Sequence, residues 1–107
     1  MDIDARRKRH KINKENARNR AREFIAAYFA KHPCVDCGEN DRIVLTFDHV
    51  RGEKINDIAN MVRAGMALEA IKAEIEKCEI RCYNCHLIRT HERLKSNRWK
   101  MVKLCHS

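Results

Sequence analysis

The sequence predicts a small, mostly helical α+β fold. Three features predict it: a long basic segment with helical periodicity, a short run of β-branched residues, and two C-x-x-C pairs. The chain has 107 residues, of which 36% are charged and 6% aromatic, so it is one domain at most with little apolar material for a core. Something besides hydrophobic burial is therefore expected to hold the fold together.

The first predicted element is a helix from Asp4 to Lys31. Apolar side chains recur in it at spacings of three and four, as on one face of a helix, and Pro33 ends it. The aromatic residues of this stripe are expected to pack against a core rather than to stack on bases. The stripe consists of Ala17, Ala21, Phe24, Ile25, Tyr28 and Phe29.

The middle of the chain combines a strand with two helices. Residues 42–50, RIVLTFDHV, are typical of a short strand between two turns. Residues 56–78 are predicted to form two helices broken near Gly65, with apolar side chains on one face. That face contains Leu68, Ile71, Ile75 and Cys78.

The last predicted elements are short. An extended piece is expected at residues 79–81, a turn at 82–85, and a helix from about His86 to Lys95. The pattern does not place residues 96–107.

Charge is unevenly distributed along the chain, whose formal net charge is +8. Residues 1–32 and 81–107 each carry +6, whereas residues 33–80 carry −4. Basic ends around an acidic middle favour a polyanion-binding molecule, with acids available to hold a metal ion. The alternative is that the charge runs are only solvated helix faces.

Two C-x-x-C pairs give the strongest signal. No apolar run resembles a signal peptide or a membrane span, so a cytoplasmic chain is expected. Thiols stay reduced in that compartment, and paired C-x-x-C motifs there more often bind metal. Four thiolates suit a closed tetrahedral zinc site, which contributes folding free energy directly; disulfides or free thiols are the alternatives. The pairs are Cys34 with Cys37 and Cys82 with Cys85, while Cys78 and Cys105 are interpreted as ordinary small apolar residues.

The 44 residues between the pairs are too many for a compact zinc finger, whose halves lie roughly 12 to 20 residues apart. Zinc is therefore expected to close a larger loop. Asp48 and His49 end the predicted strand inside this loop, and closure brings them towards His86. A carboxylate and two imidazoles are thus expected to converge on a basic surface.

The order C-x-x-C-G, FDHVRGEK and IRCYNCHLIRT over residues 34–91 resembles the HNH endonucleases, in particular the small zinc-stapled versions common in bacteriophages. The resemblance implies a ββα-metal motif that binds one catalytic divalent ion, Mg²⁺ or Mn²⁺, against a DNA phosphate. It implies Asp48 and His86 as ligands of that ion and His49 as the general base. Lys77 stands where the family usually has its central Asn.

This chemistry needs a base to deprotonate water and an electrophile to stabilise negative charge. His91 is interpreted as a flanking surface residue rather than a third ligand, because it sits roughly 140° around the helix from His86.

Cations near the site are expected to contact phosphates, and those of the first segment to contact DNA. They are Arg51, Lys54 and Arg89 near the site and Arg6, Arg7, Lys8 and Arg9 in the first segment.

We therefore expect a metal-dependent DNA endonuclease of a bacterial or phage-infected cell, with DNA as its partner and no membrane association. It would have a basic arm at 1–32, a zinc-stapled nuclease domain at 33–95 and a basic tail at 96–107. The alternative is a non-catalytic zinc-ribbon DNA-binding protein or a degenerate HNH module, and a zinc ribbon has no use for Asp48 with His49. A zinc deaminase is discarded, because the H-x-E that this chemistry requires before P-C-x-x-C is missing.

Overall fold

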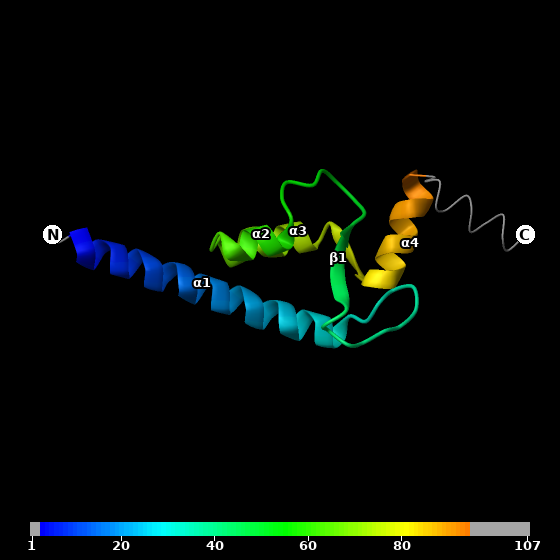
Figure 1. Cartoon of the computed structure of the whole chain (residues 1–107), viewed down its shortest axis with the longest axis horizontal. Coiled ribbons are helices and arrows are strands. Elements are labelled where there is room, and N and C mark those ends of the chain that lie inside the picture. The colour runs from blue at the N-terminus through cyan, green and yellow to red at the C-terminus, as the bar shows by residue number, and fades with distance from the viewer. Residues whose placement is uncertain (1–2, 95–107) are drawn as a thin grey trace, which may run out of the picture.

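A computed structural model describes residues 3–94 of the chain (Figure 1). The described residues form helices packed beside one two-stranded sheet, which confirms the prediction of a small, mostly helical α+β fold. The elements are α1 (Ile3–Lys31), β1 (Leu45–His49), α2 (Ile58–Arg63), α3 (Leu68–Ile75), β2 (Cys78–Cys82) and α4 (Tyr83–Leu94).

Helix α1 has two halves of different character. Residues 3–13 are exposed, and in Figure 1 this end of the helix extends beyond the rest of the molecule. The second half carries the predicted apolar stripe, and Ala21 in it is 1% exposed. Because this half packs on α2 and α3, α1 is part of the core as well as a basic arm. The division of the chain at residue 32 stays a prediction.

The core consists of two clusters of buried side chains. One lies between α1, α2 and α3, and the other lies over the hairpin and includes two of the paired cysteines. Phe47 and Tyr28 pack against both clusters, so the apolar core is continuous. The first cluster contains Ala21, Ile58, Met61, Val62, Ile71 and Ile75, and the second Cys34, Leu45, Ile80 and Cys82.

Strands β1 and β2 form an antiparallel pair, in register from Leu45 opposite Cys82 to His49 opposite Cys78. The strand predicted at 42–50 is therefore shorter, and the extended piece predicted at 79–81 is one residue longer at each end. Cys78 begins β2 rather than ending the helical face, because it pairs with His49 in this ladder.

The predicted break near Gly65 is confirmed. Gly65 has φ +70° and donates its N–H to the carbonyl of Val62, while the N–H of Met66 reaches back to the carbonyl of Met61. This pair of bonds is a Schellman motif, which ends a helix and favours glycine at the left-handed position. Helix α2 therefore stops here and α3 starts anew at Leu68.

The second C-x-x-C was predicted as a turn, and this is wrong. Cys82 ends β2, and Cys85 lies in the first turn of α4, which begins at Tyr83 rather than near His86. The Cys82 sulfur accepts a hydrogen bond from the N–H of Cys85 at 3.5 Å, the position of an N-cap acceptor, so the strand passes directly into the helix. Lys95, residues 96–107 and Cys105 lie outside the described residues.

Among the described helices, we find none that combines the length and the apolar character needed to cross a membrane.

Core packing around Ile71, which is 0% exposed, gives a first prediction. Ile71→Ala should lower the free energy of unfolding by about 3 kcal/mol, since it removes buried methyl groups and leaves a cavity between helices. Ile43→Ala, at a position 80% exposed, should change it by less than about 0.5 kcal/mol. Urea denaturation measures both, and equal effects would contradict the assignment of Ile71 to the core.

Candidate functional site

Four cysteine sulfurs cluster where the first C-x-x-C meets the junction of β2 and α4. The sulfurs of Cys34, Cys37, Cys82 and Cys85 all lie within 4.8 Å of one another, and those of Cys37 and Cys82 are 3.7 Å apart. Ligand bonds of about 2.3 Å at a tetrahedral ion place two sulfurs about 3.8 Å apart. The cluster could therefore hold a metal ion, and the predicted grouping of the two pairs is confirmed.

The backbone builds the first half of this cluster as a tight turn. The N–H of Gly38 donates to the carbonyl of Cys34, and the N–H of Cys34 donates to the carbonyl of Glu39, each at 2.9 Å. Gly38 has φ +80°, a conformation that glycine adopts without strain. The N–H of Val35 donates to the carbonyl of Ile80, which ties the turn to β2.

Thiol chemistry in the cluster suits a cation. Burial raises the pKa of Cys34, but hydrogen bonds from the backbone at Cys82, Cys37 and Asp36 outweigh it and lower the pKa to about 6. Burial and the neighbouring sulfurs raise the pKa of Cys85 far above its ordinary value. Four thiolates this close repel one another unless a positive ion compensates them, so metal binding and deprotonation are linked.

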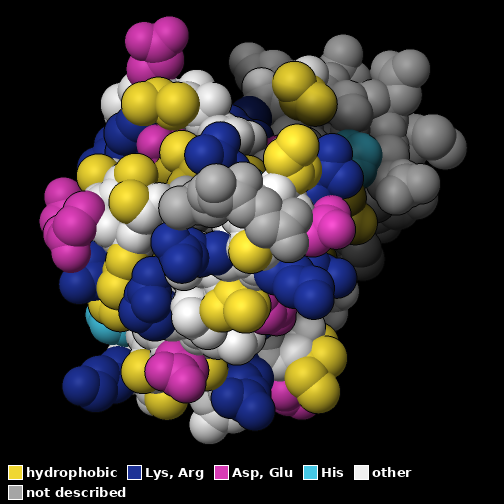
Figure 2. Space-filling view, turned by 90° about the vertical axis from the view of Figure 1, so that its left-hand side faces the viewer, with side chains coloured by type: hydrophobic (Ala, Val, Ile, Leu, Met, Phe, Trp, Pro, Cys, Tyr) yellow, Lys and Arg dark blue, Asp and Glu magenta, His cyan; other side chains and the backbone are white. Residues whose placement is uncertain are grey.

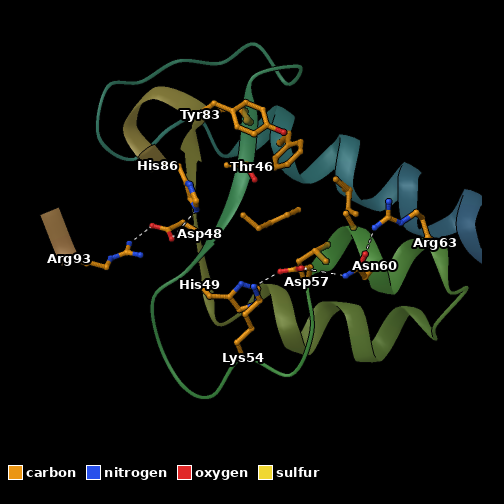
Figure 3. A pocket seen from close by; sticks show the side chains of 16 residues that line it. Thr46, Asp48, His49, Lys54, Asp57, Asn60, Arg63, Tyr83, His86 and Arg93 are labelled. Atoms are coloured by element: carbon orange, nitrogen blue, oxygen red, sulfur yellow. Dashed lines mark hydrogen bonds and ion pairs between the residues drawn. The ribbon is translucent and has the colours of Figure 1, made fainter. Parts of the chain in front are cut away.

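Asp48 and His86 face each other beside the hairpin (Figure 3). His86 Nε2 lies 3.5 Å from Asp48 Oδ1, while Asp48 Oδ2 accepts from Arg81 at 2.7 Å and from Arg93 at 2.6 Å. Burial raises the pKa of Asp48, but the hydrogen bond and charge of Arg93, with His86 and Arg81, outweigh it and lower the pKa. The carboxylate is therefore ionised, with one oxygen bound to guanidinium groups and the other facing an imidazole.

His49 is turned towards α3. Its Nε2 lies 2.9 Å from Oε2 of Glu74, whose side chain is 2% exposed. The hydrogen bond from Lys77, 2.9 Å from Oε1, lowers the pKa of Glu74 to about 2 despite burial, with the N–H of Ile55 and His49 adding to it. His49 thus rests on a buried carboxylate that is ionised at neutral pH.

Asp48, His49 and His86 line one pocket of about 680 Å³. In Figure 3, Asp48, His86 and Arg93 gather at one end and Asn60 and Arg63 at the other. Aliphatic and aromatic side chains line the space between. Two carboxylates, two imidazoles and several cations around one pocket suit an anionic substrate held beside a metal ion. The cations are Lys54, Arg63 and Arg93, and the apolar lining includes Ile25, Phe29, Leu45, Phe47 and Ile58.

Two of the three cations predicted near the site are engaged elsewhere. The Arg51 guanidinium donates to the carbonyl of Glu76, at the end of α3, and to that of Cys78, the first residue of β2. Arg89 lies 3.4 Å from Asp36, whose hydrogen bond and charge raise the pKa of Arg89. Among the described residues that line the pocket, Lys54 is present and these two are absent. Lys54 pairs there with Asp57.

The other predicted residues lie farther out. Arg6, Arg7, Lys8 and Arg9 are exposed on the first turns of α1. His91 is half-buried on α4 and is absent from the described lining of the pocket, and its interpretation as a flanking surface residue stays a prediction.

Sequence reasoning missed four charged residues of this region. Arg93 follows His86 by seven residues, a spacing that places both on one helix face, so periodicity could have indicated it. Arg63, Arg81 and Glu74 have no local signal, because tertiary packing alone brings them to the site. Arg81 is 6% exposed and binds Asp36, Asp48 and Glu79 at 2.8, 2.7 and 3.0 Å.

In comparisons with known proteins, no family model, curated protein or solved structure matches the chain. The interpretation of the site therefore depends on its own residues.

The cysteine cluster gives the second prediction. Elemental analysis should find about one transition-metal ion per chain, and Cys82→Ser should lose both the ion and cooperative thermal unfolding. Serine retains an acceptor at the start of α4, so this loss would report the ion rather than the helix cap. Cys78→Ser, a buried cysteine outside the cluster, should keep the ion. A wild type that unfolds cooperatively without metal would contradict the prediction.

Proposed function

We propose that this protein is a metal-dependent DNA endonuclease that hydrolyses phosphodiester bonds. The observation that carries the proposal is the pair Asp48 Oδ1 and His86 Nε2, 3.5 Å apart, on the wall of a pocket that also contains His49 and three cations. Strands β1 and β2 with α4 are the elements to which the resemblance to HNH endonucleases assigns a ββα-metal motif. That resemblance supports the same activity.

The ion proposed for the cysteine cluster is structural zinc. A closed set of four thiolates is the usual environment of structural zinc, and it leaves no position for substrate. Its role is therefore to hold the first C-x-x-C against the start of α4.

Asp48 and His86 are proposed to hold a second ion, Mg²⁺ or Mn²⁺. Ligands at adjacent corners of an octahedral site lie about 3.0 Å apart for bonds near 2.1 Å, so this oxygen and nitrogen need little movement. Such an ion would polarise a phosphoryl oxygen and stabilise the charge that develops on it. Three cationic side chains that line the pocket, Lys54, Arg63 and Arg93, are proposed to hold the neighbouring phosphates.

His49 is proposed as the general base. A neutral imidazole takes a proton from water at a nitrogen that carries a lone pair. Nε2 of His49 faces the Glu74 carboxylate, so the nitrogen available for this proton is Nδ1.

The exposed half of α1 is proposed to contact the DNA backbone. Figure 2 looks at this end of the molecule and shows Lys and Arg side chains on several sides rather than in one patch. Scattered cations of this kind bind phosphates without reading bases, so they add affinity that depends on salt but not on sequence.

A second candidate is a DNA-binding module without catalysis, and one observation favours it. Arg81 and Arg93 both neutralise Asp48, which lowers the attraction of this carboxylate for a divalent ion. Cleavage assays separate the two candidates.

Cleavage of supercoiled plasmid with Mg²⁺ or Mn²⁺ gives the third prediction. His49→Ala should keep zinc, fold and DNA affinity while cleavage falls on the order of 10² or more, the scale for losing a general base. His86→Ala and Asp48→Asn should also cut slowly, and a higher concentration of the divalent ion should partly restore them but not His49→Ala. Asparagine is chosen at 48 because it keeps an oxygen that can accept from Nη1 of the buried Arg81, whereas alanine would leave that N–H group without Asp48.

His91→Ala is the control for these variants and should cut at the wild-type rate. A wild type that binds DNA yet cuts none with any divalent ion, or a His49→Ala variant of full activity, would sink the nuclease proposal and favour the binding module.

The basic arm gives the fourth prediction. Replacing Arg6, Arg7, Lys8 and Arg9 by Gln should weaken binding to all DNA sequences alike and reduce the slope of log K against log salt by up to about 3 to 4. Arg42→Gln, outside α1, is the control for one exposed charge. Fluorescence anisotropy over a range of salt concentrations measures the affinity and the slope. An unchanged slope would favour the alternative that the arm is only a solvated helix face.

A further inference from the structure

We propose that Glu74 is a positioning residue for His49. Its buried carboxylate accepts a hydrogen bond from the Nε2–H group of the imidazole. This keeps the ring proton on Nε2 and the lone pair on Nδ1. The catalytic part of this inference rests on the proposed function, in which Nδ1 takes the proton from water.

Every contact of the Glu74 carboxylate described here is with a donor. Oε1 lies 2.9 Å from Lys77 Nζ, and Oε2 lies 3.1 Å from the N–H of Ile55 and 2.9 Å from Nε2 of His49. An ionised carboxylate has acceptors only, so the hydrogen of the last contact must be on Nε2. A neutral imidazole that donates from Nε2 carries its lone pair on Nδ1.

Glu74 and Lys77 also hold the loop that follows His49. Lys77 Nζ donates to the carbonyl of Glu53 at 2.8 Å, and the carbonyl of Lys77 accepts from the N–H groups of Val50 and Arg51 at 2.9 and 3.2 Å. With the bond from Ile55 to Glu74, Glu74 and Lys77 together make four hydrogen bonds to residues 50–55. The Glu74–Lys77 pair therefore fixes both His49 and the loop that follows it.

Packing alone gives no reason for a carboxylate at position 74. Glu74 lies on the buried face of α3 with Ile71 and Ile75, all of them at most 2% exposed, where an apolar residue of similar size would avoid the cost of burying a charge. The contacts that its charge makes are with Lys77, Ile55 and His49, and the imidazole faces the pocket. The charge at position 74 is therefore explained by its hydrogen bonds to His49 and to the adjoining loop.

Glu74→Gln makes this inference testable. Glutamine has one acceptor oxygen and one donor NH₂ group, so its NH₂ must face either Lys77, in the place of Oε1, or both Ile55 and His49, in the place of Oε2. The Lys77 ammonium cannot accept a hydrogen bond, so the oxygen should stay on Lys77; the NH₂ then loses the Ile55 bond and can donate to Nε2 of His49 if the proton moves to Nδ1. The variant should therefore hold His49 in the tautomer that cannot take a proton from water.

The fifth prediction is read first from the tautomer, independently of cleavage. Long-range ¹H–¹⁵N NMR of the metal-loaded full chain at pH 9 should show the proton of His49 on Nε2 in the wild type and on Nδ1 in Glu74→Gln. Glu69→Gln, the same change at an exposed position of α3, should match the wild type. A wild type with the proton on Nδ1 would overturn the proposal, even where Glu74→Gln does not fold or no DNA is cut.

Cleavage supplies the second readout. Glu74→Gln should lower turnover at saturating DNA on the order of 10², with DNA affinity changed less than about threefold, because a tautomer affects the chemical step. Added to His49→Ala, the same change should lower cleavage less than about twofold, since its effect passes through His49. Equal losses in both backgrounds would show that Glu74 acts only on the fold and would overturn the positioning role.

Discussion

The site depends most on the ion pairs of Arg81. This residue is 6% exposed, and its guanidinium binds carboxylates from three segments: Asp36 of the first C-x-x-C, Asp48 of β1 and Glu79 of β2. Burial lowers the pKa of Arg81, but the hydrogen bonds and charges of these carboxylates, that of Asp36 first, outweigh it and raise the pKa. A buried charge that must keep its partners fixes the segments that supply them, so the cysteine turn and the candidate ligand Asp48 are positioned together.

The two arginines on Asp48 differ in burial, and this difference separates their roles. The side chain of Arg81 is 7% exposed, so leaving Asp48 would cost this desolvated cation one of its three carboxylate partners, whereas the side chain of Arg93 is 48% exposed. An exposed guanidinium loses little when it exchanges one anion for another. In the proposed nuclease, Arg93 is therefore the arginine that is available to a phosphate, and Arg81 belongs to the framework.

Local patterns predicted the elements of the fold, and tertiary contacts decided the details of the site. Periodicity and Pro33 bounded α1, Gly65 marked the break between α2 and α3, and the C-x-x-C spacing grouped the four sulfurs. The pairing of Glu74 with His49 could not be predicted from the sequence, because it depends on how α3 packs across the hairpin. Arg51 and Arg89 remain predicted phosphate contacts, although the structure engages them with carbonyls and with Asp36, away from the pocket lining.

The segment CYNCH, residues 82–86, connects the cysteine cluster to the pocket within five residues. Cys82 ends β2, accepts the N–H of Cys85 at the start of α4, and contributes its sulfur to the cluster. One atom therefore sets both the direction of α4 and the geometry of the four sulfurs. Because His86 follows Cys85 directly, its distance from Asp48 depends on that direction. An ion in the cluster would thus stabilise the Asp48–His86 pair as well as the fold, which is how a chain with a small core can hold ligands from distant segments in register.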